Sequence, residues 1–140
     1  VAPAGGVYQA GTLSGNPVAM AAGIAMLTIL KEHPEYYQEL DKKAEGFYGK
    51  MQEILKKSGQ PYQINHVGSL GCLYFTSTEV ADYESAKTSD TKAFASYCRY
   101  MVSHGIYLAP SQFEAMFLSM AHTEELLEQT LRQMEQYFCV

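Results

Sequence analysis

A glycine-rich segment near the start of the chain has residue types that bind phosphate groups. In Gly11-Thr12-Leu13-Ser14-Gly15, the glycines allow backbone N–H groups to approach an anion closely, and Thr12 adds a hydroxyl donor. A segment rich in Gly, Ser and Asn is also typical of an ordinary loop before a helix. From these residues alone the ordinary loop is favoured, and phosphate binding is the alternative.

Glu114 is the charged residue of a second segment, Pro110-Ser111-Gln112-Phe113-Glu114, which joins two predicted strands. The residues that follow it, Ala115-Met116-Phe117, are apolar. Because burial of an unpaired carboxylate costs free energy, Glu114 lies either in solvent at a turn or in a pocket with a partner. The residues alone favour the turn in solvent.

Other reactive chemistries lack the necessary spacing. The glycine-rich segment is not a nucleophile elbow, because its serine stands one place too late, and not a Walker loop, because Asn16-Pro17 follows it. No zinc-ligand or disulfide spacing relates the cysteines and histidines, which are Cys72, Cys98, Cys139, His33, His66, His104 and His122. We therefore predict no metal site, and reduced thiols of the kind found in the cytoplasm.

Composition and charge indicate a globular protein that binds neither nucleic acid nor membranes. Hydrophobic residues make up 47% of the chain, which is enough for a packed core. The formal net charge of −5 disfavours attraction to nucleic acids and anionic lipids. The most apolar run, Val18–Leu30, is shorter than the ~20 residues that cross a bilayer. Because the chain starts at Val1 without an initiator methionine, we expect a part of a longer protein.

Two helices are predicted in the first half of the chain. Asn16 can cap, and Pro17 can begin, a helix that runs to about Glu32. This helix is apolar nearly all round, so it needs cover on most sides. After His33-Pro34, apolar residues three or four apart predict a long amphipathic helix that Ser58-Gly59 ends. Those apolar residues are Tyr37, Leu40, Ala44, Phe47, Met51 and Leu55.

Strands and helices alternate in the second half. Strands are predicted at about 62–67 and 70–76, with Gly68-Ser69 between them as in a hairpin. Two more are predicted at about 106–109 and 116–120. The polar residues 79–91 predict a loop in which Ser89 or Asp90 caps the next helix. That helix ends at Gly105, and the last helix opens at Thr123. Their predicted core residues are Phe94, Tyr97, Met101, Val102, Leu127, Leu131, Met134 and Phe138.

This order predicts the α+β class. The expected architecture is a small, mainly antiparallel sheet covered by helices, preceded by a buried helix and a long amphipathic connecting helix.

Three stretches resemble one enzyme family. The string VYQAGTLSGNPVAMAAG is similar to the segment that follows the cofactor lysine in class III, fold-type I aminotransferases. The string GIYLAPSQFEAMFLSMAHTEE resembles the C-terminal signature of the glutamate-1-semialdehyde aminomutases, and YESAKTSDTKAF also fits that family. The resemblance spans essentially the whole chain. It implies that residues 1–33 end the large cofactor-binding domain and that residues 34–140 form the C-terminal small domain.

The resemblance also implies a cofactor, a partner and site residues. Pyridoxal 5′-phosphate is the family's cofactor, and its Schiff-base lysine lies upstream of Val1, so we expect no catalytic residue here. The chain alone should be inactive and without cofactor. In the homodimeric parent, Gly11 and Thr12 match the residues that contact the phosphate of the partner subunit's cofactor. Glu114 matches a glutamate near the small-molecule substrate.

The implied activity is isomerisation of glutamate 1-semialdehyde to 5-aminolevulinate in tetrapyrrole synthesis. Many class III transaminases bind a substrate carboxylate with an arginine from the C-terminal domain, because its fork matches that anion. The arginines here, Arg99 and Arg132, both fall on predicted helices, and the turn segment offers Glu114 instead. Two alternatives stay open: the small domain of another class III aminotransferase, or, for this chain alone, a non-catalytic dimerisation or docking module.

Overall fold

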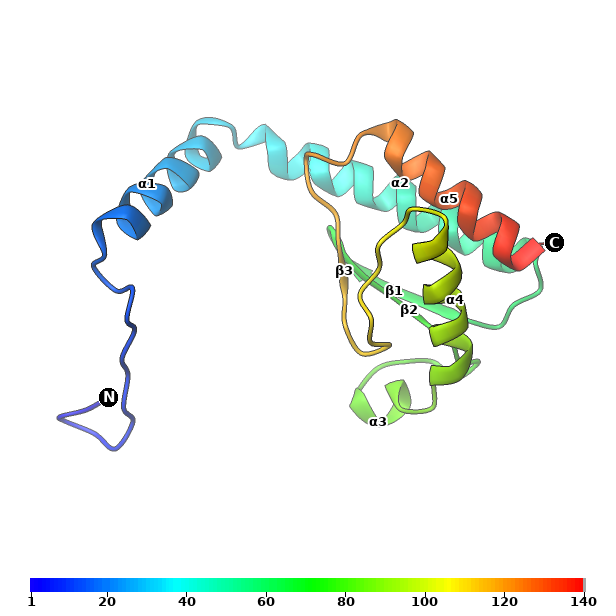
Figure 1. Ribbon diagram of the computed structural model, residues 1–140, viewed down its shortest axis with the longest axis horizontal. Helices are drawn as coiled ribbons and strands as arrows, with labels where there is room; N and C mark the ends of the chain where they lie inside the picture. Colours follow the sequence, from blue (N-terminus) through cyan, green and yellow to red (C-terminus); the bar gives the residue numbers. More distant parts are fainter. Residues whose placement is uncertain (140) are drawn as a thin grey trace. The chain divides into compact units, whose positions relative to one another are not determined.

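The computed structural model describes residues 1–139 and divides the chain into two compact units, Val1–Tyr36 and Tyr37–Val140. Each unit is described by itself. The helices are α1 (Pro17–Glu32), α2 (Glu35–Lys57), α3 (Tyr83–Ala86), α4 (Thr91–Ser103) and α5 (Glu124–Cys139), and the strands are β1 (Gln63–Val67), β2 (Leu70–Tyr74) and β3 (Met116–Phe117) (Figure 1). The α+β class and the antiparallel sheet are confirmed.

The first unit is a loop followed by α1, which begins and ends where the sequence predicts. The side-chain oxygen of Asn16 accepts hydrogen bonds from the N–H groups of Val18 (3.0 Å) and Ala19 (3.1 Å), and Pro17 occupies the first turn. None of the helix's residues is buried, so the described residues do not provide the predicted cover. Its exposed large apolar residues are Val18, Met20, Ile24, Met26, Leu27 and Ile29.

Helix α2 is the main core helix of the second unit. It buries Ala44, Phe47, Met51 and Leu55 as predicted, and also Tyr48 and Ile54. Tyr37, the first residue of that apolar pattern, lies in the first turn of the helix and is 56% exposed. The helix ends at Lys57, and Gly59 follows with a φ of 69°, a conformation that suits glycine. There the N–H groups of Gly59 and Gln60 bond to the carbonyls of Lys56 and Leu55, which closes the last turn.

The sheet has the order β1-β2-β3. Its first two strands form the predicted hairpin, in which Val67 pairs with Leu70 and Gly68 turns the chain with a φ of 53°. Tyr48 of α2 packs on this sheet: a Cβ at Gly71 would lie 2.4 Å from the Tyr48 ring, so position 71 needs glycine. The Tyr48 hydroxyl donates to the Ser69 carbonyl at 3.1 Å, which satisfies the polar end of a fully buried ring.

Aromatic and aliphatic side chains from α2, α4, α5 and the sheet fill one core. The Phe75 ring centroid lies 4.4–6.0 Å from those of Tyr62, Phe94, Tyr97 and Phe138. The predicted core residues Leu127, Leu131 and Met134 of α5 are buried, and Phe138 packs partly buried against them. Helices α2 and α5 run side by side in Figure 1, and the Lys57–Glu135 ion pair joins their ends.

Four predictions for the second unit need correction. Residues 106–109 form no strand, and the predicted strand 116–120 is reduced to Met116–Phe117. The predicted loop 79–91 contains the short helix α3, because Asp82 and Ser85 form a reciprocal capping box at its start. Val102 is 48% exposed and is not a core residue.

The missing strand has a local cause. Beyond β3, the Gln112 side chain bonds to the Leu73 carbonyl and to the N–H of Phe75, groups that a further strand beside β2 would need. Residues 106–109 therefore pack through the side chains of Ile106 and Leu108 and not through a backbone ladder.

Candidate functional site

The loop before α1 contains a tight turn that two backbone hydrogen bonds close. The N–H of Ser14 donates to the Gly11 carbonyl at 3.0 Å, and the N–H of Asn16 donates to the Leu13 carbonyl at 3.0 Å. A Cβ at Gly11 would lie 2.6 Å from the Ser14 hydroxyl oxygen, so any other residue at this position would require the Ser14 side chain to move. Glycine therefore fits this turn without a change in its neighbours.

Thr12 supplies the donors of this turn. It is exposed, and within residues 1–139 no hydrogen bond engages its hydroxyl or its N–H. The first N–H groups of α1 are less accessible, because the Asn16 side chain already accepts from two of them. An anion at this end of the helix would thus meet the donors of the loop, and the residues present fit a phosphate group.

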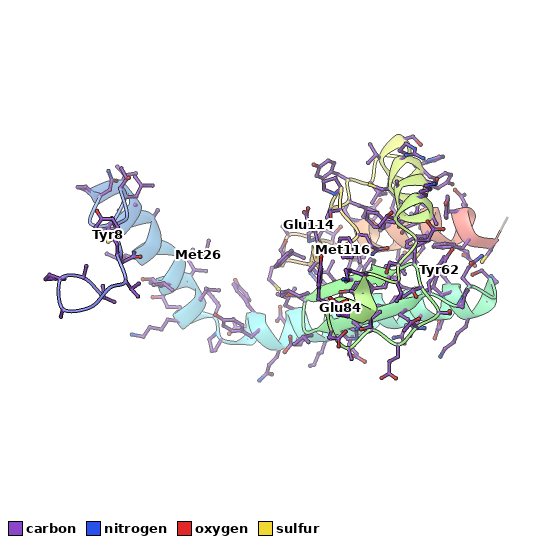
Figure 2. The ribbon with its side chains drawn as sticks, turned by 90° about the horizontal axis from the view of Figure 1, so that it is seen from below. Tyr8, Met26, Tyr62, Glu84, Glu114 and Met116 are labelled. Carbon is purple, nitrogen blue, oxygen red and sulfur yellow. The ribbon has the colours of Figure 1, made fainter. Side chains whose placement is uncertain are left out.

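Glu114 lies at a turn near the edge of the second unit, where Figure 2 labels it beside Met116. Its N–H donates to the Ser111 carbonyl at 3.2 Å, and the N–H of Phe113 donates to the Ser111 hydroxyl at 3.2 Å. The Glu114 side chain is exposed, and within the part of the chain that the structure describes no cation pairs with it. The sequence left two placements open for Glu114, a turn in solvent and a pocket with a partner. Within this chain Glu114 lies at a turn in solvent.

Gln112 holds this turn and was missed by the sequence reasoning. It is 3% exposed, its side-chain nitrogen donates to the Leu73 carbonyl at 2.7 Å, and its side-chain oxygen accepts from the N–H of Phe75 at 3.2 Å. The available signal was a lone glutamine between a proline turn and apolar residues. A polar side chain placed there is buried only when its hydrogen bonds are satisfied.

Cys72 makes a second attachment to the same turn. Its sulfur lies 3.5 Å from the Gln112 carbonyl oxygen and 3.7 Å from that of Glu114, and these two acceptors share its one thiol hydrogen. Burial raises the pKa of the Cys72 thiol, which keeps the group protonated and able to donate. The buried thiol thus acts as a structural donor and not as a nucleophile.

The chain segments on either side of the turn line a hollow of about 330 Å³. Most of its lining is apolar, and its residues are Phe47, Ile106, Tyr107, Leu108, Ala109, Ala115, Met116, Phe117, Leu118, His122, Leu127 and Thr130. This lining contains no pair of acidic and basic groups for proton transfer. The hollow can hold apolar atoms but provides no reaction centre by itself.

Lysines, acids and thiols elsewhere add no further reactive cluster among the described residues. Lys43 is partly buried, and its side-chain nitrogen donates to the carbonyls of His122 (2.7 Å) and Met120 (3.4 Å), so it has a structural role. No group of three His, Cys, Asp or Glu side chains in residues 1–139 is placed to hold a metal ion. In the same residues, none of the helices has the length and apolarity needed to cross a membrane.

The predicted site residues fall into both units. Gly11 and Thr12 belong to the first unit, and Glu114 belongs to the second, together with Gln112 and Cys72. Each set is therefore a feature of its own unit.

Comparison with known sequences gives one consistent family. The profile of the aminotransferase class-III family matches residues 1–138. "Glutamate-1-semialdehyde 2,1-aminomutase 1" of Lachnoclostridium phytofermentans is 58% identical over 135 residues, which are 96% of this chain and 32% of that protein. The aminomutase of Ruminiclostridium cellulolyticum is 54% identical over 136 residues, or 97% of this chain and 31% of that protein. The chain spans about a third of the length of these relatives.

Solved structures agree on the fold. A transaminase with bound PLP is 24% identical with a TM-score of 0.75, and covers 99% of this chain and 31% of its own. A β-phenylalanine aminotransferase from Variovorax paradoxus is 23% identical with a TM-score of 0.82, and covers 98% of this chain and 31% of its own.

Proposed function

Because the chain belongs to the class III aminotransferase family, we propose that it is the C-terminal part of a glutamate-1-semialdehyde aminomutase. The whole enzyme would convert glutamate 1-semialdehyde to 5-aminolevulinate. The observation that carries the proposal is the identity of 50–58% to proteins named as this aminomutase, over 94–99% of the chain. We also propose a cytoplasmic location, because the free thiols Cys72, Cys98 and Cys139 suit a reducing compartment.

Pyridoxal 5′-phosphate would supply the electron sink that amino-group transfer needs. We assign Gly11 and Thr12 to its phosphate, in a homodimer where the loop serves the cofactor of the partner subunit. The close approach of Gly11 and Ser14 in the tight turn and the unengaged donors of Thr12 support this role. The lysine that binds the cofactor would lie upstream, in the large domain that ends with residues 1–33, so the chain alone would be inactive.

Glu114 is assigned to the substrate side of the site, on the small domain that we place at residues 34–140. A carboxylate there attracts the amino group of a substrate and repels a second carboxylate, as in dicarboxylic amino acids. Arginine is placed elsewhere: Arg99 lies on α4 and bonds to Ser96, and Arg132 lies on α5 near Glu128. An aminomutase moves an amino group within one substrate and needs no site for a separate dicarboxylic oxo acid.

Another class III aminotransferase is the second candidate. The fold of the β-phenylalanine aminotransferase from Variovorax paradoxus matches well, but its identity of 23% shows the fold alone. The higher identity to the aminomutases favours the first candidate.

The test is Glu114→Gln in the full-length protein, because this change keeps the shape and removes the charge. We expect slower turnover of glutamate 1-semialdehyde, greater tolerance of dicarboxylic amino acids and unchanged cofactor affinity. The matched control is Glu84→Gln, an exposed glutamate of α3 whose ion pair with Lys87 is local (Figure 2). If Glu114→Gln has wild-type kinetics with every substrate, Glu114 is only a turn residue and the choice of aminomutase loses its residue-level support.

A further inference from the structure

We propose that Gln112 is a positioning residue for Glu114. Its buried carboxamide takes the place of a neighbouring strand beside β2 and thereby fixes the turn that presents the Glu114 carboxylate. This inference rests on the proposed function of Glu114 and adds the residue through which the fold controls it.

The attachment of Gln112 has the geometry of a strand pairing made by a side chain. Leu73 lies on β2, and Phe75 lies two residues further along the chain. The side-chain nitrogen of Gln112 donates to the Leu73 carbonyl (2.7 Å), and its side-chain oxygen accepts from the N–H of Phe75 (3.2 Å). These three residues are 3%, 4% and 2% exposed in the order Gln112, Leu73, Phe75. Because water does not replace a lost partner at such buried groups, the two bonds persist together.

The turn backbone is then tied on both sides of Phe113. The carbonyls of Gln112 and Glu114 share the one hydrogen of the Cys72 thiol, and the N–H of Glu114 donates to the Ser111 carbonyl. The Glu114 backbone is thus anchored to β2, while its side chain stays exposed and able to meet a substrate. The backbone bonds of the turn therefore fix the position of the Glu114 carboxylate, although none of them contacts the carboxylate itself.

Glutamine suits position 112 better than amino acids of similar size or chemistry. Asparagine is one methylene shorter and cannot span both β2 groups, glutamate lacks the donor, and leucine lacks both polar atoms. A displacement of a binding group by about 1 Å can slow a reaction by about a hundred-fold, so the anchoring of the turn affects turnover.

The experiment is a double-mutant cycle in the full-length protein with bound pyridoxal 5′-phosphate. Gln112→Leu should lower kcat/KM for glutamate 1-semialdehyde by about ten- to a hundred-fold and leave cofactor affinity unchanged. In a Glu114→Gln background the same change should cost less than about two-fold, because Gln112 acts through Glu114. The control is Gln63→Leu, the same replacement on β1, where the side chain only donates to the Pro61 carbonyl at the surface.

A second readout does not depend on activity. In Gln112→Leu the N–H of Phe75 should exchange with solvent faster, and the Cys72 thiol should react faster with an alkylating reagent, by about ten-fold or more if ~1.4 kcal/mol of local stability is lost. Gln63→Leu should change neither rate. Site-resolved mass spectrometry distinguishes Cys72 from the other thiols.

Two results would overturn the inference. If the losses of Gln112→Leu and Glu114→Gln multiply fully, Gln112 is a structural residue that does not act through Glu114. If Phe75 exchange and Cys72 alkylation stay at wild-type rates, the attachment does not hold the turn. A wild-type protein that makes no 5-aminolevulinate would instead overturn the proposed function, and the cycle is then measured on whichever amino-group transfer the protein performs.

Discussion

The two units of this chain use apolar residues in opposite ways. Helix α1 of the first unit is apolar on most faces and buries none of its residues, whereas α2 carries its apolar residues on one face and buries six of them. Full burial of one large apolar side chain stabilises a fold by about 1.5–3 kcal/mol. The second unit therefore holds its own core, while the first unit needs cover from outside the described residues.

The same contrast appears in the candidate sites. The Gly11–Thr12 turn has donors that nothing in the described chain engages, whereas the Glu114 turn is anchored to its own sheet by Gln112 and Cys72. We read the first unit as built for contact with other parts of the protein, and the second as a self-supporting carrier of one exposed carboxylate.

The largest expected difference between the units is in their response to loss of an apolar side chain. Phe75→Ala removes a ring that is 2% exposed and should destabilise the second unit by about 3–5 kcal/mol. Leu27→Ala removes a side chain of α1 that is 67% exposed, so it should change the unfolding free energy of this chain by less than about 0.5 kcal/mol. Denaturant titrations of both variants compare their unfolding free energies with that of the wild type.

In the full-length protein we predict that other residues cover α1, and Leu27→Ala should then cost about 2 kcal/mol or more. An equal, small cost in both settings would break the contrast between the units, because α1 would then be a surface helix in the whole protein too.

A smaller effect is expected for Thr12→Ala, and it should appear in cofactor affinity and not in the free energy of unfolding. The change removes one hydroxyl donor to a phosphate, and a hydrogen bond to a charged group is worth about 1.5–3 kcal/mol. Affinity of the full-length protein for pyridoxal 5′-phosphate should fall by about ten- to a hundred-fold, and excess cofactor should largely restore activity.

The control for Thr12→Ala is Thr130→Ala. The Thr130 hydroxyl donates to the Leu126 carbonyl within α5. Cofactor titration of both variants decides the role of the loop. Unchanged affinity in Thr12→Ala would remove the phosphate contact from the account.

The smallest expected effect sharpens the comparison with two matched helix caps. Asp90 accepts from the N–H groups of Lys92 and Ala93 at the start of α4, just as Asn16 accepts from two N–H groups at the start of α1. Asp90→Ala should lower the unfolding free energy of the second unit by about 1 kcal/mol, whereas Asn16→Ala should leave it unchanged. Equal losses in thermal unfolding would show that the two units unfold together.

The sequence predicted the elements whose signals are local. The Asn16-Pro17 start of α1 and the hairpin turn at Gly68-Ser69 depend on neighbouring residues, and both are confirmed. Of the two caps predicted for α4, Ser89 or Asp90, the structure has Asp90. The Ile106–Ala109 strand was wrong because a strand needs a partner edge, and alternation of side chains does not reveal whether one is free.

The site was predicted less completely. Glu114 was placed at a turn in solvent or in a pocket, and the chain shows the turn. Gln112 and Cys72 were missed because their roles depend on contacts between the turn and β2, which lie about forty residues apart in the sequence. Such long-range side-chain bonds follow from the packing of the second unit and leave no periodic pattern.

The central claim is that this chain completes an aminomutase, and product formation tests it most directly. The measurement is the rate of 5-aminolevulinate formation from glutamate 1-semialdehyde by the full-length protein with pyridoxal 5′-phosphate and no second oxo acid. The account predicts turnover by the full-length protein and none by residues 1–140 alone. Turnover that requires a separate amino donor and a separate oxo acid would contradict it, and would identify a transaminase.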